Sequence, residues 1–119
     1  MRLSELGPAQ TVITGVQLAS GERMANIGYD RGRGSFWCVP CDYVPVSYPG
    51  TGDLFAAVLT GALLGDDSLP MAMNRATRFV ELAIKTTFGY GTDPRHGVML
   101  ERVLDRLAQR ESLSDYQLL

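Results

Sequence analysis

Two glycines, a threonine and an aspartate stand directly before a long apolar run. The tetrapeptide is Gly50-Thr51-Gly52-Asp53, and the apolar run covers residues 54–64. Glycine permits backbone conformations barred to other residues, and a helix N-terminus offers unpaired N–H groups to an anion. A carboxylate in the first turn can accept a hydroxyl proton while those amides stabilise charge on a transferred phosphoryl group. The stretch therefore predicts a phosphoryl-transfer site, although these four residues alone are equally compatible with a turn that caps a helix.

A second candidate site lies at residues 37–41, where Trp-Cys-Val-Pro-Cys resembles the thioredoxin redox motif and holds both cysteines of the chain. That chemistry requires the first thiol at a helix N-terminus, where its pKa is lowered. Pro45 and Pro49 exclude a helix directly after the motif. On a strand Cys38 and Cys41 would face opposite sides, so we expect free thiols and keep a redox function as the lesser alternative.

Other groups that could do chemistry are isolated in the sequence. Asp66 and Asp67 are expected at a solvated junction between helices, and His96 in a solvated loop. The chain has no Gly-x-x-x-x-Gly-Lys-Ser/Thr motif, which excludes a P-loop. We therefore assign no residue of this chain to a metal.

Strands followed by helices must position the glycine-rich stretch. The patterns predict strands at residues 11–18, 24–29 and 35–43, with a hairpin link at 30–34. A helix is expected from residue 51 or 52 to 64, and its apolar character on nearly every face predicts that it is buried. Ser68 is expected to cap a second helix that runs to about residue 88, and residues 98–107 show the spacing of a third.

Length and composition are those of one ordinary globular domain. The chain has 119 residues, of which 45% are hydrophobic and 20% charged, and its net charge is −2. Its basic residues are scattered, which argues against a nucleic-acid partner, and no apolar run is long enough for a membrane span. We expect a cytoplasmic protein.

The order of the elements suggests a fragment. Strands first and helices after would fit an α+β domain, but also the last portion of a larger α/β domain. Residues 3–8 look like the end of a helix that leads into a strand, as in an αβ unit whose beginning is missing. We therefore expect residues 1–119 to form a single domain that is the C-terminal fragment of a larger one.

Five stretches, taken in order, resemble the C-terminal part of the ribokinase-like superfamily and, within it, the pyridoxal/pyridoxamine kinases. They are LGP at residues 6–8, VITG at 12–15, YPGTGDLFAA at 48–57, LLGDDSLPMA at 63–72 and FGYGTDPRHG at 88–97. The resemblance covers nearly the whole chain. It implies an α/β, three-layer fold with a central sheet between helices, and ATP-dependent phosphorylation of the 5′-hydroxymethyl group of pyridoxal, pyridoxamine or pyridoxine, a reaction of vitamin B6 salvage.

The same resemblance assigns roles at the glycine-rich stretch. Asp53 matches the catalytic base that deprotonates the alcohol. Gly50, Thr51 and Gly52 match the anion hole that holds the transferred group.

Three further residues match the nucleotide site of the family. Thr14 falls near the ATP phosphates, although the family often has serine where this chain has Gly15. Val44 and Val46 fall where apolar residues cover the adenine, with packing in the core as the alternative.

Much of a family member is absent from this chain. The missing part would carry the vitamer pocket, the lid and the acidic residues that position Mg²⁺. The resemblance implies ATP and Mg²⁺ as cofactors, yet we do not expect the chain to catalyse the reaction alone. One alternative is a non-catalytic fragment or assembly module that self-associates through exposed apolar faces and strand edges, so a homo-oligomer is expected. Another is a kinase for a hydroxymethylpyrimidine, an acceptor of close relatives.

Overall fold

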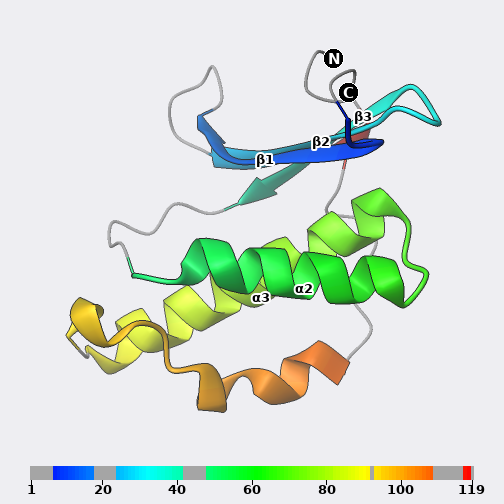
Figure 1. Ribbon diagram of the computed structural model, residues 1–119. Helices are drawn as coiled ribbons and strands as arrows, with labels where there is room; N and C mark the ends of the chain where they lie inside the picture. The colour runs from blue at the N-terminus through cyan, green and yellow to red at the C-terminus, as the bar shows by residue number, and fades with distance from the viewer. Residues whose placement is uncertain (1–6, 18–23, 42–47, 92, 109–116, 119) are drawn as a thin grey trace.

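The computed structural model describes residues 7–17, 24–41, 48–91, 93–108 and 117–118. They form one sheet, two long helices that lie on one face of it, and short 3₁₀ turns on the far side of the helices (Figure 1). The arrangement confirms the predicted α/β class.

The sheet is antiparallel and has the strand order β1-β2-β3-β4. Its strands are β1 (Gln10–Gln17), β2 (Met24–Asp30), β3 (Ser35–Cys41) and β4 (Gln117–Leu118). The three predicted strands are confirmed in the described residues, and the predicted strand residues 18, 42 and 43 lie outside them. β4, which pairs with Trp37 and Cys38, was not predicted because two residues carry no periodic signal.

The two helices begin as their local sequence predicts. α2 (Thr51–Leu64) follows Gly50, and α3 (Leu69–Tyr90) follows Ser68. The Ser68 hydroxyl accepts a hydrogen bond of 3.4 Å from the Met71 N–H, and Pro70 lies in the first turn of α3. This confirms the predicted cap at the start of α3.

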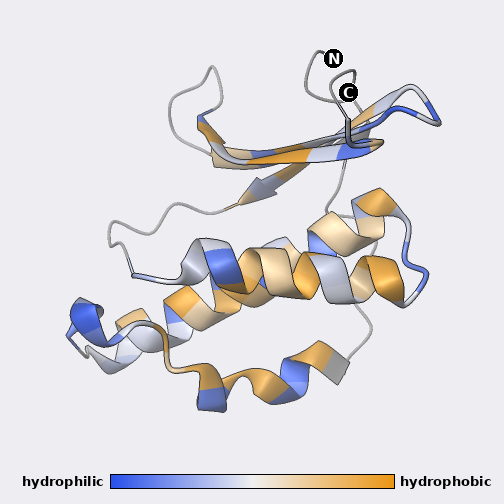
Figure 2. Ribbon diagram, viewed as in Figure 1, coloured by the Kyte–Doolittle hydropathy of each residue, from blue (hydrophilic) through white to orange (hydrophobic). Residues whose placement is uncertain are grey.

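Two apolar clusters hold the layers together. One joins α2, α3 and the 3₁₀ turns, and the other joins α3 to the sheet; Figure 2 shows hydrophobic residues along all of these elements. The buried members of the first cluster are Phe55, Val58, Ala76, Phe79, Ala83 and Val103, and those of the second are Val39, Leu69 and Met73.

α2 is not buried on all sides, contrary to the prediction from its composition. Phe55 and Val58 are buried, but Ala57 and Gly61 are exposed and Leu64 is 81% exposed. The physical reason is that α3 and the sheet cover only one side of α2 in the described part of the chain. Neither α2 nor any other described helix is both long and apolar enough to cross a membrane.

The predicted third helix at residues 98–107 is also wrong. The chain there forms the 3₁₀ turns η2 (Leu100–Arg102) and η3 (Leu104–Ala108), after the turn η1 (Pro94–His96). Between η2 and η3, Val103 leaves the helical path with φ −128° and is only 2% exposed. Val103 packs against α2 and α3, and its burial there replaces the continuous helix that the apolar spacing predicted by short turns.

Candidate phosphoryl-transfer site

The start of α2 is a helix N-terminus that no side chain of the described residues caps. Gly50 stands before it with φ 85°, a left-handed conformation that glycine adopts without strain. The Thr51 hydroxyl does not cap the helix, because it donates instead to the Tyr48 carbonyl oxygen at 3.3 Å. The first-turn N–H groups of α2 are therefore available to an anion.

The space beside the two glycines of this turn is open. A Cβ atom built on Gly50 or Gly52 would meet no atom within 4 Å. Asp53 lies in the first turn of the helix and is exposed, at the positive end of the helix dipole. The structure thus brings the four predicted residues together in one accessible turn, while their roles in catalysis stay predictions.

The loop after α3 lies against this turn. A Cβ atom on Gly97, which has φ 73°, would come within 3.5 Å of the Pro49 carbonyl oxygen. In the same loop the Arg95 guanidinium pairs with the Asp93 carboxylate at 2.8 Å, and hydrogen bonds from Arg95 lower the pKa of Asp93. His96 is exposed, as predicted for a solvated loop.

Thr14 lies on an exposed part of β1, where the strand bulges. The register with β2 shifts between residues 13 and 16, so that Thr14 and Gly15 both stand opposite Asn26. β1 and β3 are both antiparallel to β2 and end on one side of the sheet, the side at which α2 begins (Figure 1). The structure therefore places Thr14 towards the same end of the molecule as the start of α2. Val44 and Val46 lie outside the described residues.

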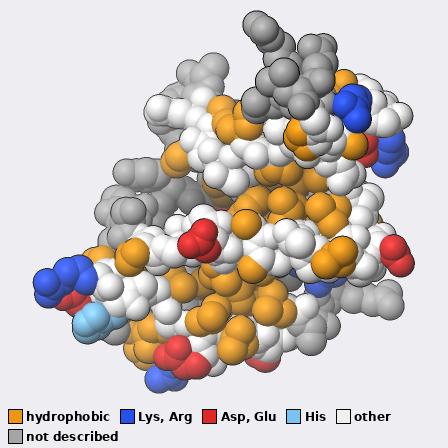
Figure 3. Space-filling view, viewed as in Figure 1, with side chains coloured by type: hydrophobic (Ala, Val, Ile, Leu, Met, Phe, Trp, Pro, Cys, Tyr) orange, Lys and Arg blue, Asp and Glu red, His pale blue; other side chains and the backbone are white. Residues whose placement is uncertain are grey.

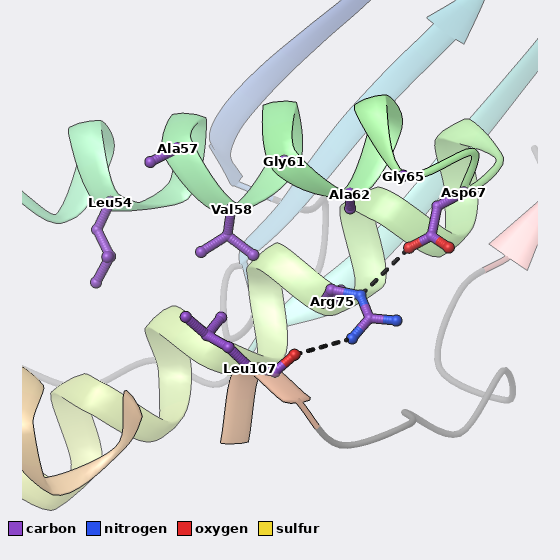
Figure 4. A pocket seen from close by; sticks show the side chains of 9 residues that line it. All are labelled: Leu54, Ala57, Val58, Gly61, Ala62, Gly65, Asp67, Arg75 and Leu107. Atoms are coloured by element: carbon purple, nitrogen blue, oxygen red, sulfur yellow. Dashed lines mark hydrogen bonds and ion pairs between the residues drawn. The ribbon is translucent and has the colours of Figure 1, made fainter. Parts of the chain in front are cut away.

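A groove of about 460 Å³ runs beside α2 and reaches η3 (Figure 4). Its polar end is closed by Arg75, which pairs with Asp67 at 3.2 Å and donates to the Leu107 carbonyl at 3.4 Å. The remaining lining is apolar or small and consists of Leu54, Ala57, Val58, Gly61, Ala62 and Gly65. The sequence did not predict this groove, because it depends on how segments far apart in the chain meet.

The two cysteines do not form a thioredoxin-like site. Both are on β3 rather than at a helix N-terminus, and no disulfide joins them. Cys38 is 4% exposed, and its burial raises the pKa of the thiol. A redox catalyst needs the opposite shift, so the redox alternative receives no support. Within the part of the chain that the structure describes, no three His, Cys, Asp or Glu side chains gather in a way that could hold a metal ion.

The sheet, the helices on it and the glycine-led turn before Asp53 together define part of a ribokinase-like kinase fold. Residues 1–99 match the model of a family described as phosphomethylpyrimidine kinase. The chain belongs to this phosphomethylpyrimidine kinase family. A comparison with curated proteins gives no match.

Solved structures share the fold. A provisionally assigned phosphomethylpyrimidine kinase from Bacteroides thetaiotaomicron is 42% identical over 99% of this chain and 40% of its own, with a TM-score of 0.94. A pyridoxal kinase from Lactobacillus plantarum is 31% identical over 85% of this chain and 36% of its own, with a TM-score of 0.73. A pyridoxal kinase from Leishmania donovani, solved with ADP, has the same fold at 23% identity over 98% of this chain and 40% of its own, with a TM-score of 0.80. This chain therefore spans less than half the length of these relatives.

Proposed function

We propose that this chain carries the phosphoryl-transfer centre of an ATP-dependent kinase that acts on the 5′-hydroxymethyl group of a pyridoxal-type vitamer. The observation that carries the proposal is the uncapped, open start of α2 with an exposed carboxylate in its first turn. A structural cap would fill that space or bond those amides, and no described side chain does so.

Each residue of the turn has a role in this proposal. Asp53 takes the proton of the acceptor hydroxyl, whose oxygen then bonds to the γ-phosphorus as the bond from that phosphorus to the β,γ-bridging oxygen breaks. The amides of residues 51–53 stabilise the negative charge on the transferred group. Gly50 and Gly52 keep the approach to these amides free of side chains.

The chain also fits the phosphates of ATP, which supplies the transferred γ-phosphoryl group when bound. The open amides of α2 and the exposed Thr14 would hold these phosphates. Mg²⁺ belongs to the proposal as the ion that neutralises phosphate charge, with its ligands on the part of the kinase that this chain does not span.

Pyridoxal is favoured as the acceptor by a relative. The Bacteroides thetaiotaomicron protein, 42% identical to this chain, has been crystallised with pyridoxal. The description of the family favours a second candidate, a hydroxymethylpyrimidine. Both acceptors present a hydroxymethyl group on an aromatic ring, so the chemistry proposed for Asp53 is the same for either.

The proposed function is tested with this chain alone and with a chimera. The chimera carries this chain in place of the matching 40% of the Bacteroides thetaiotaomicron relative. We expect ATP-dependent phosphorylation of pyridoxal by the chimera in the presence of Mg²⁺, with a higher kcat/KM than for hydroxymethylpyrimidine, and none by the chain alone. The reverse order of kcat/KM would make the pyrimidine the acceptor. No turnover by the chimera and no ATP binding by the chain would overturn the kinase function.

A second candidate function, self-association, is favoured by the exposed apolar surface of α2. Figure 3 shows hydrophobic side chains above and below α2 on the face turned to the viewer. Leu64, at the end of the helix, is 81% exposed. We propose that a second copy of the chain covers this surface, because apolar groups exposed to water favour association.

Leu64→Glu is expected to weaken this self-association. A charge at so exposed a position does little to the fold but opposes burial of the surface between two copies. Sedimentation velocity over a range of concentrations should show association of the unmodified chain and a shift of the variant towards the monomer. The control is Ile13→Glu, the same kind of change at a residue of β1 that is 43% exposed and faces away from the helices, because its neighbour Val12 packs towards them. A chain that is monomeric at every concentration contradicts the proposal, as does an equal effect of both variants.

A further inference from the structure

The bulge that carries Thr14 is fixed by a buried side chain of the neighbouring strand. Gly15 has φ 69° and is exposed, and its N–H donates to Asn26 Oδ1 at 3.1 Å. This bond lies at the break in the β1–β2 ladder, where Thr14 and Gly15 both stand opposite Asn26. The side chain of Asn26 therefore replaces the backbone partner that Gly15 would have in a regular strand.

Asn26 is held in turn from the helix layer. Its Nδ2 donates to the Thr77 hydroxyl of α3 at 2.8 Å. Asn26 is 7% exposed and Thr77 3%, so neither side chain has water as an easy alternative partner. Because the Thr77 hydroxyl accepts from Nδ2, it fixes which way the Asn26 amide points, with the amide oxygen towards Gly15.

Burying a side-chain amide lowers the stability of the fold unless its polar atoms are hydrogen-bonded. If only packing mattered, an apolar residue at this position would therefore stabilise the fold more. Here the buried pair, Asn26 and Thr77, links the centre of α3 to the exposed bulge of β1. The exposed end of that link is Gly15, next to the residue proposed to lie near the ATP phosphates.

We propose that Asn26, oriented by Thr77, is a positioning residue that holds the Thr14–Gly15 bulge in the conformation that binds the phosphates of ATP. The inference rests on the proposed function, since it takes Thr14 to be at the nucleotide. Asn26 and Thr77 need not touch the nucleotide, because they act through the Gly15 N–H.

The test removes the Thr77 hydroxyl and keeps the shape of the side chain. Thr77→Val leaves the Asn26 amide without its partner, whereas Thr77→Ser keeps the hydroxyl and is the matched control. Asn26→Ala removes the link altogether, but it also leaves a gap in the core and is the second variant. In the 119-residue chain, we expect Thr77→Val to weaken binding of ATP with Mg²⁺ about tenfold, the loss that one hydrogen bond explains, and Thr77→Ser to bind as the unmodified chain does.

Steady-state kinetics of the chimera distinguish a specific effect on the ATP site from a general loss of structure. We expect Thr77→Val to raise the KM for ATP about tenfold and to leave kcat and the KM for pyridoxal within about twofold. Equal KM values for ATP in the valine and serine variants would overturn the inference. So would a change that affects ATP and pyridoxal alike.

Hydrogen exchange at the Gly15 amide makes the outcome independent of the kinase function. Faster exchange in Thr77→Val than in Thr77→Ser is the expected result, because the Gly15 N–H loses a fixed acceptor. Unchanged exchange would overturn the link itself, whatever the chain binds. Faster exchange in a chain that binds no ATP would overturn the proposed function and, with it, the role of Asn26 at a nucleotide.

Discussion

Asp53→Asn is expected to lower kcat for pyridoxal phosphorylation by the chimera about 100- to 10 000-fold, the usual contribution of a general base. The asparagine amide has nearly the size of the carboxylate but cannot accept the hydroxyl proton. Affinity for ATP is expected not to fall, because the amides of α2 are unchanged and a negative charge beside the phosphates is removed. The measurement is steady-state kinetics together with direct titration of ATP.

Asp66→Asn is the matched control for this change. Asp66 is exposed and lies just after α2, at the other end of the helix from Asp53. Its φ of 70° suits asparagine, which tolerates the left-handed region. We expect kcat to be unaffected there. A chimera with Asp53→Asn that keeps its kcat would show that Asp53 is only a first-turn acidic residue and that the proton goes elsewhere.

The features that the sequence predicted correctly are those that local chemistry decides. The strands alternate or are rich in β-branched residues, Ser68 caps α3, and Gly50 takes a positive φ where the chain turns into α2. Each of these depends on neighbours within a few residues. For the same reason the four residues of the candidate site could be placed together, because all of them lie in one turn.

The features that the sequence did not predict depend on contacts between distant segments. The composition of α2 cannot say how many of its faces find a partner, and the spacing of residues 98–107 cannot say that Val103 buries itself between two turns. The bond between Asn26 and Thr77 joins residues 51 apart. Its one local signal was an asparagine between Ala25 and Ile27 in a predicted strand, and the apolar periodicity used to predict that strand gives no weight to such a residue.

One such contact sets the distance between the sheet and α3. Gly28 of β2 faces Met73, and a Cβ atom on Gly28 would lie 2.4 Å from the Met73 Sδ. Met73 is fully buried, so its side chain has little room to move away. The glycine is therefore needed for close approach of strand and helix rather than for a turn.

Gly28→Ala is expected to lower the free energy of unfolding by about 1–3 kcal/mol, because it overpacks this contact. Met73→Ala alone is expected to cost about 2–5 kcal/mol, since it leaves a cavity in the core. In the Met73→Ala background the clash is gone, so Gly28→Ala should there be nearly neutral or favourable. Urea unfolding of the four proteins gives the coupling energy, which we expect at about 1–3 kcal/mol.

The control for the glycine change is Gly61→Ala, at a position of α2 where a Cβ atom would meet nothing within 4 Å. It should stabilise the chain by about 0.5–1 kcal/mol, because alanine is the better helix former. If the losses of unfolding free energy caused by Gly28→Ala and Met73→Ala were additive, that would contradict the contact between these residues. It would mean that α3 can shift on the sheet to make room, and a helix free to shift could not hold Asn26, and through it the Thr14 bulge, in one place.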